Sequence, residues 1–84
     1  MTETAENRLK RLRIRSWRRG TKEMDMILGP FSDDELAALG AAQLDAYEAL
    51  LSENDQDLYL WVSGQAPTPP EHVSILDLIR ARLG

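Results

Sequence analysis

The chain contains no cysteine and only one histidine, His72, among its 84 residues. Without cysteine there can be no disulfide, no thiolate nucleophile and no cysteine-ligated zinc or iron–sulfur site. A single histidine also excludes a histidine-rich metal centre. No apolar run approaches the roughly 20 residues that span a bilayer, and no apolar stretch follows the N-terminal basic residues. The sequence therefore predicts a cytoplasmic chain with neither a signal peptide nor a membrane anchor.

Patterns typical of β-strands are missing as well, since valine and threonine are few and no segment alternates apolar with polar residues. Apolar residues recur instead at helical spacing in five segments, roughly 6–18, 24–39, 41–52, 55–63 and 69–83. The sequence predicts an all-α protein, a small five-helix antiparallel bundle with short connections. We expect one domain over residues 1–84, disordered in residues 1–5 and monomeric, with a core that includes Ile27, Phe31, Leu51, Trp61 and Ile79.

Gly29-Pro30 interrupts the second helical segment and leaves two interpretations open. Pro30 lacks the N–H that would continue the helix, and the following Ser32–Glu35 stretch has the pattern of a capping box, which would start a new helix. The alternative is a single kinked helix from about Gly20 to Leu39. A second capping box is expected at Thr68–Glu71, with proline at the first position of the last helix.

Lysine and arginine are absent from residues 23–79, which hold twelve acidic residues. Residues 1–22 hold eight of the ten basic residues and only two acids. The net charge of −4 and the pI near 4.8 therefore hide a basic end and an acidic body. Charge separated in this way steers the encounter with a partner of complementary charge.

The stretch from Arg15 to Asp25 joins two predicted helices through a glycine flanked by charged residues. Gly20 can adopt a positive φ and exposes backbone that another chain can approach closely. Arg19 and Glu23 are four residues apart and can pair if one helix contains both, which would contribute at most ~0.5 kcal/mol. The spacing alone fits a helix–turn–helix corner with solvated charges.

The same stretch resembles the RGxxE signature of the succinate dehydrogenase flavinylation factors, the bacterial SdhE type and their mitochondrial relatives. Arg19, Gly20 and Glu23 occupy the three signature positions. A second block resembles the family pattern of an aromatic residue, a leucine pair and an acidic turn before a tryptophan: Tyr47, Leu50, Leu51, Asp55, Asp57, Leu58, Tyr59 and Trp61. The resemblance covers about residues 15–61, with a weaker match through the last helical segment. It implies a five-helix bundle with a long second helix, and so favours the kinked helix over the break.

The resemblance also implies a function: an assembly factor, not an enzyme, that binds the flavoprotein subunit of succinate dehydrogenase and promotes covalent attachment of FAD to it. Fumarate reductase is a second candidate client. The residues expected to bind the partner are Arg19, Gly20 and Glu23, together with Asp25, Arg15 and Trp17. We expect no catalytic residue and no metal in this chain, because it shows no nucleophile–base pair and no metal-ligand cluster. We also expect no tightly bound cofactor, because the chain lacks a glycine-rich phosphate loop.

Two other functions fit parts of the sequence. The basic segment from Arg8 to Lys22 would suit phosphate contact in a small nucleic-acid-binding protein, but the acidic body would repel a polyanion, so no nucleic acid is expected. A generic helical interaction module could use the same segment. Among single residues, Trp17 fits partner contact and cation–π stacking equally well. Tyr59 and Trp61 could form an aromatic platform, but their helical spacing favours core packing, so both are expected in the core. His72 is expected at an exposed or capping position.

Overall fold

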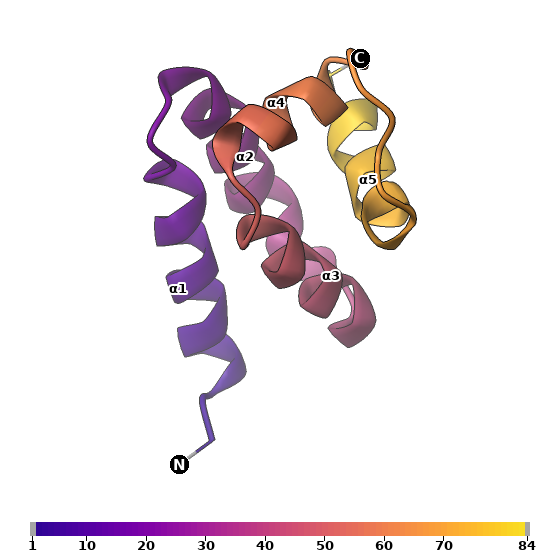
Figure 1. Ribbon diagram of the computed structural model, residues 1–84. Helices are drawn as coiled ribbons and strands as arrows, with labels where there is room; N and C mark the ends of the chain where they lie inside the picture. Colours follow the sequence, from indigo (N-terminus) through magenta and orange to yellow (C-terminus); the bar gives the residue numbers. More distant parts are fainter. Residues whose placement is uncertain (1, 84) are drawn as a thin grey trace.

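The computed structural model describes residues 2–83, and within that range it contains helices and no strands (Figure 1). The helices are α1 Ala5–Trp17, α2 Lys22–Glu35, α3 Ala41–Leu51, α4 Asp55–Val62 and α5 Val73–Leu83. Two short 3-10 turns, η1 Leu36–Ala38 and η2 Pro70–His72, follow α2 and precede α5. The prediction of a small all-α, five-helix bundle is confirmed.

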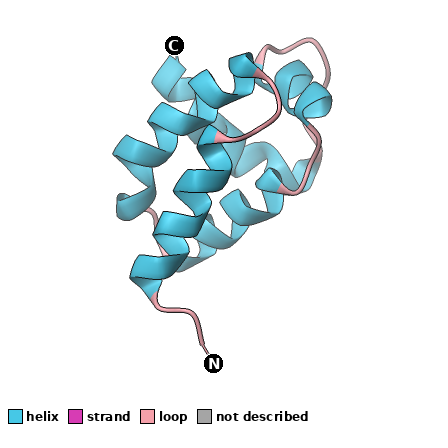
Figure 2. Cartoon of the chain, turned by 90° about the vertical axis from the view of Figure 1, so that its left-hand side faces the viewer, coloured by secondary structure: helices cyan, strands magenta, loops and turns pink. Residues whose placement is uncertain are grey.

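The helices pack around one core, and α1 lies alongside α2 in both views (Figures 1 and 2). The turn between α3 and α4 returns to the end of the bundle where α1 joins α2 (Figure 1). Of the five residues expected in the core, Phe31, Leu51, Trp61 and Ile79 are buried. Ile27 is only half-buried at the edge of the core, because α2 turns Met24, Leu28 and Phe31 inward instead.

The first helix begins within the segment that was expected to be disordered. Thr4 is its N-cap, and its Oγ1 accepts a hydrogen bond from the backbone N–H of Asn7 at 3.1 Å. The capping bond satisfies one of the four amide groups that a helix start leaves free, so Ala5 is already helical. The expected disorder therefore does not extend to Thr4 and Ala5, and Met1 lies outside the described residues.

Helix α2 continues through Gly29-Pro30, which confirms the single helix and rules out the break. The capping box that the alternative interpretation placed at Ser32–Glu35 does not form. The Ser32 hydroxyl is buried and donates to the carbonyl of Gly29 at 2.6 Å, inside the helix. Leu28 and Phe31 on either side of Pro30 are both buried in the same core, and their packing outweighs the local cost of the proline.

The connection into α5 differs from the prediction. Pro70–His72 forms a 3-10 turn with Pro69 before it, and no side chain makes a capping bond there, so the expected capping box at Thr68–Glu71 is wrong. His72 is buried, not exposed: its ring lies 5.5 Å from the ring of Trp61, and its Nε2 lies 2.8 Å from Oε2 of Glu53. Packing against the α3–α4 turn thus replaces a local cap at this end of the bundle.

A polar pair lies inside the core where α1 meets α3. The hydroxyls of Ser16 and Tyr47 are 2.6 Å apart, and both side chains are fully buried. Ser16 also donates to the carbonyl of Leu12 at 2.7 Å, and the Tyr47 ring stacks on Phe31 at 5.5 Å. Burial raises the pKa of Tyr47 to about 12, while the bond with Ser16 opposes part of the shift. The neutral phenol is therefore the form that the fold stabilises.

This shift predicts a specific loss of stability at alkaline pH. The folded pKa of Tyr47 lies above the value near 10 of an unfolded chain, so the contribution is complete below pH 10 and is lost as pH rises toward 12. We expect ionisation of Tyr47 to lower the free energy of unfolding, relative to neutral pH, by about 1 kcal/mol at pH 11 and about 2 kcal/mol at pH 12. Urea unfolding of the wild type and of Tyr47→Phe from pH 8 to 12 isolates this term. Parallel pH profiles for the two proteins would refute it.

Candidate partner-binding site

The corner between α1 and α2 is built by two side chains from the start of α2. Thr21 is the N-cap of α2, and its hydroxyl accepts from the backbone N–H of Met24 at 3.3 Å. Oδ1 of Asp25 accepts from the backbone N–H of Arg19 at 2.6 Å. Gly20, which lies between Arg19 and Thr21 in the chain, has φ +110°, a conformation that residues with a side chain rarely adopt. Asp25, one of the expected partner-binding residues, therefore holds the corner in shape.

Arg19 lies in the corner outside both helices, and its guanidinium is turned into the protein. Its Nε donates to Oδ1 of Asp55 at 2.8 Å, and its Nη1 and Nη2 donate to the carbonyls of Leu51 and Glu53, both at 2.7 Å. The Arg19 and Asp55 side chains are only 11% and 15% exposed. Arg19 thus satisfies carbonyls that the end of α3 leaves free and binds the start of α4.

This arrangement answers the question of whether Arg19 pairs with Glu23. The two are not in one helix, and the acid bound to Arg19 is Asp55, 36 residues away in sequence. Arg15 reinforces the contact, since its Nη2 donates to the carbonyl of Leu51 at 3.3 Å. We call the contacts of Arg19 with Leu51, Glu53 and Asp55 the arginine clamp. The clamp joins the RGxxE corner rigidly to the α3–α4 turn.

Gly20 is required by space as well as by backbone angle. A Cβ built on Gly20 would lie 3.2 Å from Oδ2 of Asp55, closer than an ordinary van der Waals contact. Any other residue would therefore strain its own backbone and press on the carboxylate that Arg19 binds. The first two residues of the signature, Arg19 and Gly20, build the corner.

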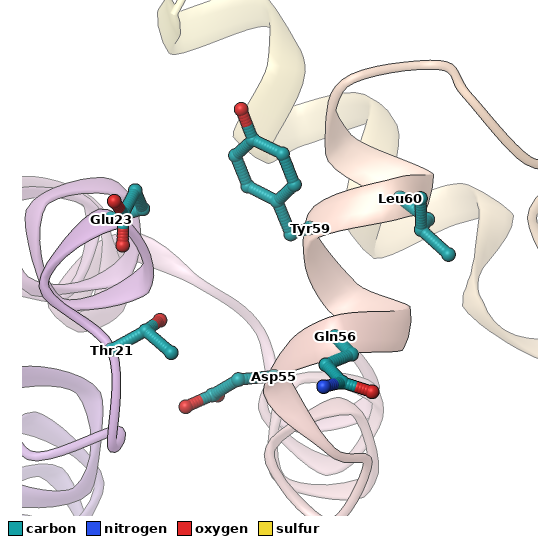
Figure 3. Close-up of a pocket in the computed structure, with 6 residues that line it drawn as sticks. All are labelled: Thr21, Glu23, Asp55, Gln56, Tyr59 and Leu60. Atoms are coloured by element: carbon teal, nitrogen blue, oxygen red, sulfur yellow. The ribbon is translucent and has the colours of Figure 1, made fainter.

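Glu23, the third residue of the signature, is different. It is exposed in the first turn of α2, and no other residue in the range 2–83 forms an ion pair or a side-chain hydrogen bond with it. A negative charge is favourable at this end of a helix. Beside Glu23 opens a pocket of about 510 Å³, which we call the α2–α4 groove, lined by Thr21, Glu23, Asp55, Gln56, Tyr59 and Leu60. Figure 3 shows Thr21 and Glu23 on one side of this space and the α4 residues on the other.

Tyr59 is part of this groove and not of the core. Its side chain is 42% exposed, whereas Trp61, two residues on, is 9% exposed and belongs to the core. The expectation that both aromatic residues are buried is therefore wrong for Tyr59. Because α4 is only eight residues long and lies at the edge of the bundle, its Leu58, Trp61 and Val62 face the core and Tyr59 falls on the outer side.

Trp17 contacts a different part of α2. Its indole N–H lies 3.2 and 3.3 Å from the two carboxylate oxygens of Asp33, and its ring covers Gly29 so closely that a Cβ there would lie 2.4 Å from ring carbons. This is packing on a glycine with a charge-assisted hydrogen bond, and among residues 2–83 no cation stacks on the ring. The side chain is still 39% exposed.

Several arginines of the basic N-terminal segment form ion pairs with acidic residues of the same molecule. Arg8 donates to Asp45 at 2.7 Å, and both Arg8 and Arg11 donate to Glu48, at 3.2 and 2.9 Å, so the basic α1 is attached to the acidic α3. The bond from Arg11 holds the pKa of Glu48 below its usual range. Arg13 pairs with Asp33 as well. With these arginines occupied, the basic segment offers few free cations for nucleic acid.

Residues 2–83 contain no cluster of three or more metal-ligating side chains. None of the helices in that range is both long enough and apolar enough to cross a membrane.

Comparison with known proteins places the chain in a family. A sequence model of the family described as "Flavinator of succinate dehydrogenase" matches residues 10–83, which include the corner, the clamp and the groove. The chain belongs to this flavinator family. The match takes in α5 as well as the stretch from Arg15 to Trp61.

Individual relatives agree with this assignment. The FAD assembly factor SdhE of Legionella pneumophila (strain Lens) is 36% identical over 75 residues, which are 89% of this chain and 95% of the relative. Two proteins called "Succinate dehydrogenase assembly factor 2, mitochondrial" are similar: that of Mycosarcoma maydis is 37% identical and that of Meyerozyma guilliermondii 38%, each over 68 residues and 81% of this chain. The chain spans 29% and 50% of the lengths of these two mitochondrial relatives.

The flavinator fold brings most of the expected partner-binding residues together. Arg19, Gly20, Glu23 and Asp25 form one corner and Arg15 adjoins it, whereas Trp17 lies against Gly29 and Asp33. Asp55 and Tyr59 are two site residues that sequence reasoning missed as such. Both residues belong to the second block of the family resemblance. The presence of that block together with the RGxxE signature was the sequence feature that could have pointed to them. Their position beside the corner depends on a contact across 36 residues, which no local spacing reveals.

Proposed function

We propose that this chain is an assembly factor that binds the flavoprotein subunit of succinate dehydrogenase and promotes covalent attachment of FAD to it. Membership of the flavinator family supports the client and the cofactor. The observation that carries the proposal is the contrast within the signature. Arg19 and Gly20 are built into the corner, and that corner presents Glu23, whose carboxylate no other residue in the range 2–83 pairs with, beside an open groove. A charge held in this way suits recognition of another protein.

The proposed mechanism requires no catalytic group in this chain. Covalent attachment needs a nucleophilic histidine and stabilisation of negative charge on the flavin, both of which the client can supply. The assembly factor acts by binding most tightly to the client conformer in which histidine and flavin are aligned, so it raises the population of that conformer. The gain comes from orientation of reacting groups. FAD stays with the client, and this chain holds no cofactor tightly.

The proposal also covers the oligomeric state of the chain, its location and its other partners. We propose further that the chain works as a monomer in the cytoplasm and that fumarate reductase is a second client. The internal pairing of Arg8, Arg11 and Arg13 argues against a nucleic-acid partner.

Expression of the chain in a bacterial strain that lacks its own flavinylation factor tests the proposal. We expect the flavoprotein subunit to regain in-gel flavin fluorescence under denaturing conditions, because only covalently attached flavin survives them. The empty vector is the control. An expressed, folded chain that leaves the subunit without fluorescence would contradict the proposed function.

A further inference from the structure

The α2–α4 groove combines an aromatic face with a single free negative charge. Tyr59 is 42% exposed beside the groove, although its neighbour in the helix, Leu58, is fully buried. The lining contains two carboxylates and no cation. Asp55 is already paired with Arg19 at 2.8 Å, so Glu23 is the carboxylate left to interact. Both walls are fixed relative to each other, since the arginine clamp ties the α1–α2 corner to the start of α4.

We propose that this groove receives an arginine side chain from the surface of the client flavoprotein. The inference rests on the proposed function and names the chemistry that the corner recognises. A guanidinium carries positive charge on a planar, weakly hydrated group that stacks on a tyrosine ring and forms two parallel bonds to one carboxylate. Glu23 supplies the carboxylate from one side of the space and Tyr59 the ring from the other (Figure 3).

Charge complementarity excludes the other occupants. An acidic segment would meet Glu23 and Asp55 without a free cation in the lining. An uncharged apolar segment would bury the carboxylate of Glu23 without a partner, which is costly. Arg19, whose partner Asp55 lines the groove, does not fill the role either, since its guanidinium is bound by Asp55 and two carbonyls.

A charge series at Gln56 tests the sign of the occupant. Gln56 is exposed and lines the groove from α4, so substitutions there leave the core and the clamp untouched. We expect Gln56→Lys to weaken binding of the purified flavoprotein subunit roughly tenfold, since it adds a cation that repels the arginine and competes for Glu23. Gln56→Glu should bind as tightly as the wild type or more tightly. Equal affinities for the two variants, or the reverse order, would overturn the proposal.

A second series tests the aromatic face. Tyr59→Leu keeps apolar bulk but removes the ring, so affinity for the subunit should fall roughly 3- to 30-fold, whereas Tyr59→Phe should stay within about twofold of the wild type. Combining Tyr59→Leu with Glu23→Gln should weaken binding by less than the product of the two single effects, because both residues hold one side chain. Circular dichroism shows whether Tyr59→Leu is folded. If the folded variant binds the subunit with wild-type affinity, the stacking is refuted.

The result also separates this inference from the proposed function. If the wild type binds the subunit and supports flavinylation but the Gln56 and Tyr59 series show no effect, the groove assignment is wrong and the function stands. If the wild type does not bind the subunit at all, both are wrong.

Discussion

Arg19→Ala is expected to lower the free energy of unfolding by about 3 kcal/mol, because it removes one partner of a largely buried ion pair. The substitution leaves the carboxylate of Asp55, 15% exposed, without its cation. It also leaves the carbonyl of Glu53 without its donor, and the carbonyl of Leu51 with only the longer bond from Arg15. The loss should appear as a lower urea midpoint with an unchanged slope.

Arg18→Ala is the matched control for this prediction. Arg18 is the neighbouring residue, is exposed, and makes no ion pair with any residue in the range 2–83. Its replacement should change stability by less than ~0.5 kcal/mol, the usual range for a surface site. Arg19→Lys should be intermediate, since an ammonium cannot reach an acid and two carbonyls with the fixed fork of a guanidinium. Equal stabilities for the Arg18 and Arg19 alanine variants would show that the clamp does not hold the corner.

Glu23→Ala is expected to have the opposite profile: almost no effect on stability and loss of function. Glu23 is exposed, and its side chain is bound to no other described residue, so the free energy of unfolding should change by less than ~0.5 kcal/mol. Covalent flavin on the client should nevertheless fall to the level found without the chain, because the free carboxylate of the corner is gone. The measurement is in-gel flavin fluorescence in the complemented strain, beside urea unfolding of the purified variant.

Asp77→Ala is the control for charge alone. Asp77 is exposed on α5 and loses the same negative charge when replaced, but it does not line the α2–α4 groove. This variant should support flavinylation like the wild type. Wild-type fluorescence with a folded Glu23→Ala would assign the whole signature to folding. Gly20→Arg is less informative, since the positive φ of Gly20 and its closeness to Asp55 predict a loss of roughly 1 kcal/mol or more in stability itself.

Local sequence patterns predicted the features that depend on neighbouring residues, above all the helices. Helical spacing alone predicted the five helices. The continuity of α2 through Pro30 needed the family resemblance, because the packing of Leu28 and Phe31 decides it and the local signal favours a break. Local spacing also suggested two capping boxes that do not form. The Ser32 hydroxyl bonds the carbonyl of Gly29 inside α2, and no side chain caps the turn before α5.

The roles within the candidate site could not be read from spacing. Arg19, Gly20, Glu23 and Asp25 were correctly grouped, but the sequence did not distinguish the residues that build the corner from the one that it presents. That distinction depends on Asp55 and on carbonyls at the end of α3, which reach Arg19 only after the chain has folded back over 32 to 36 residues. The positions of His72 and Tyr59 were also predicted wrongly, because the short 3-10 turn before α5 and the short edge helix α4 carry too few residues to define a buried face.

The most direct test of the account is reconstitution with purified components. Flavoprotein subunit of succinate dehydrogenase without bound flavin is incubated with FAD, alone or with the wild-type chain, Glu23→Ala or Asp77→Ala. Covalent flavin is followed over time by fluorescence of the denatured subunit. We expect faster attachment with the wild type and with Asp77→Ala, whereas Glu23→Ala should give the rate of the subunit alone. The same rate with and without the wild-type chain would contradict the claim that this protein promotes flavinylation.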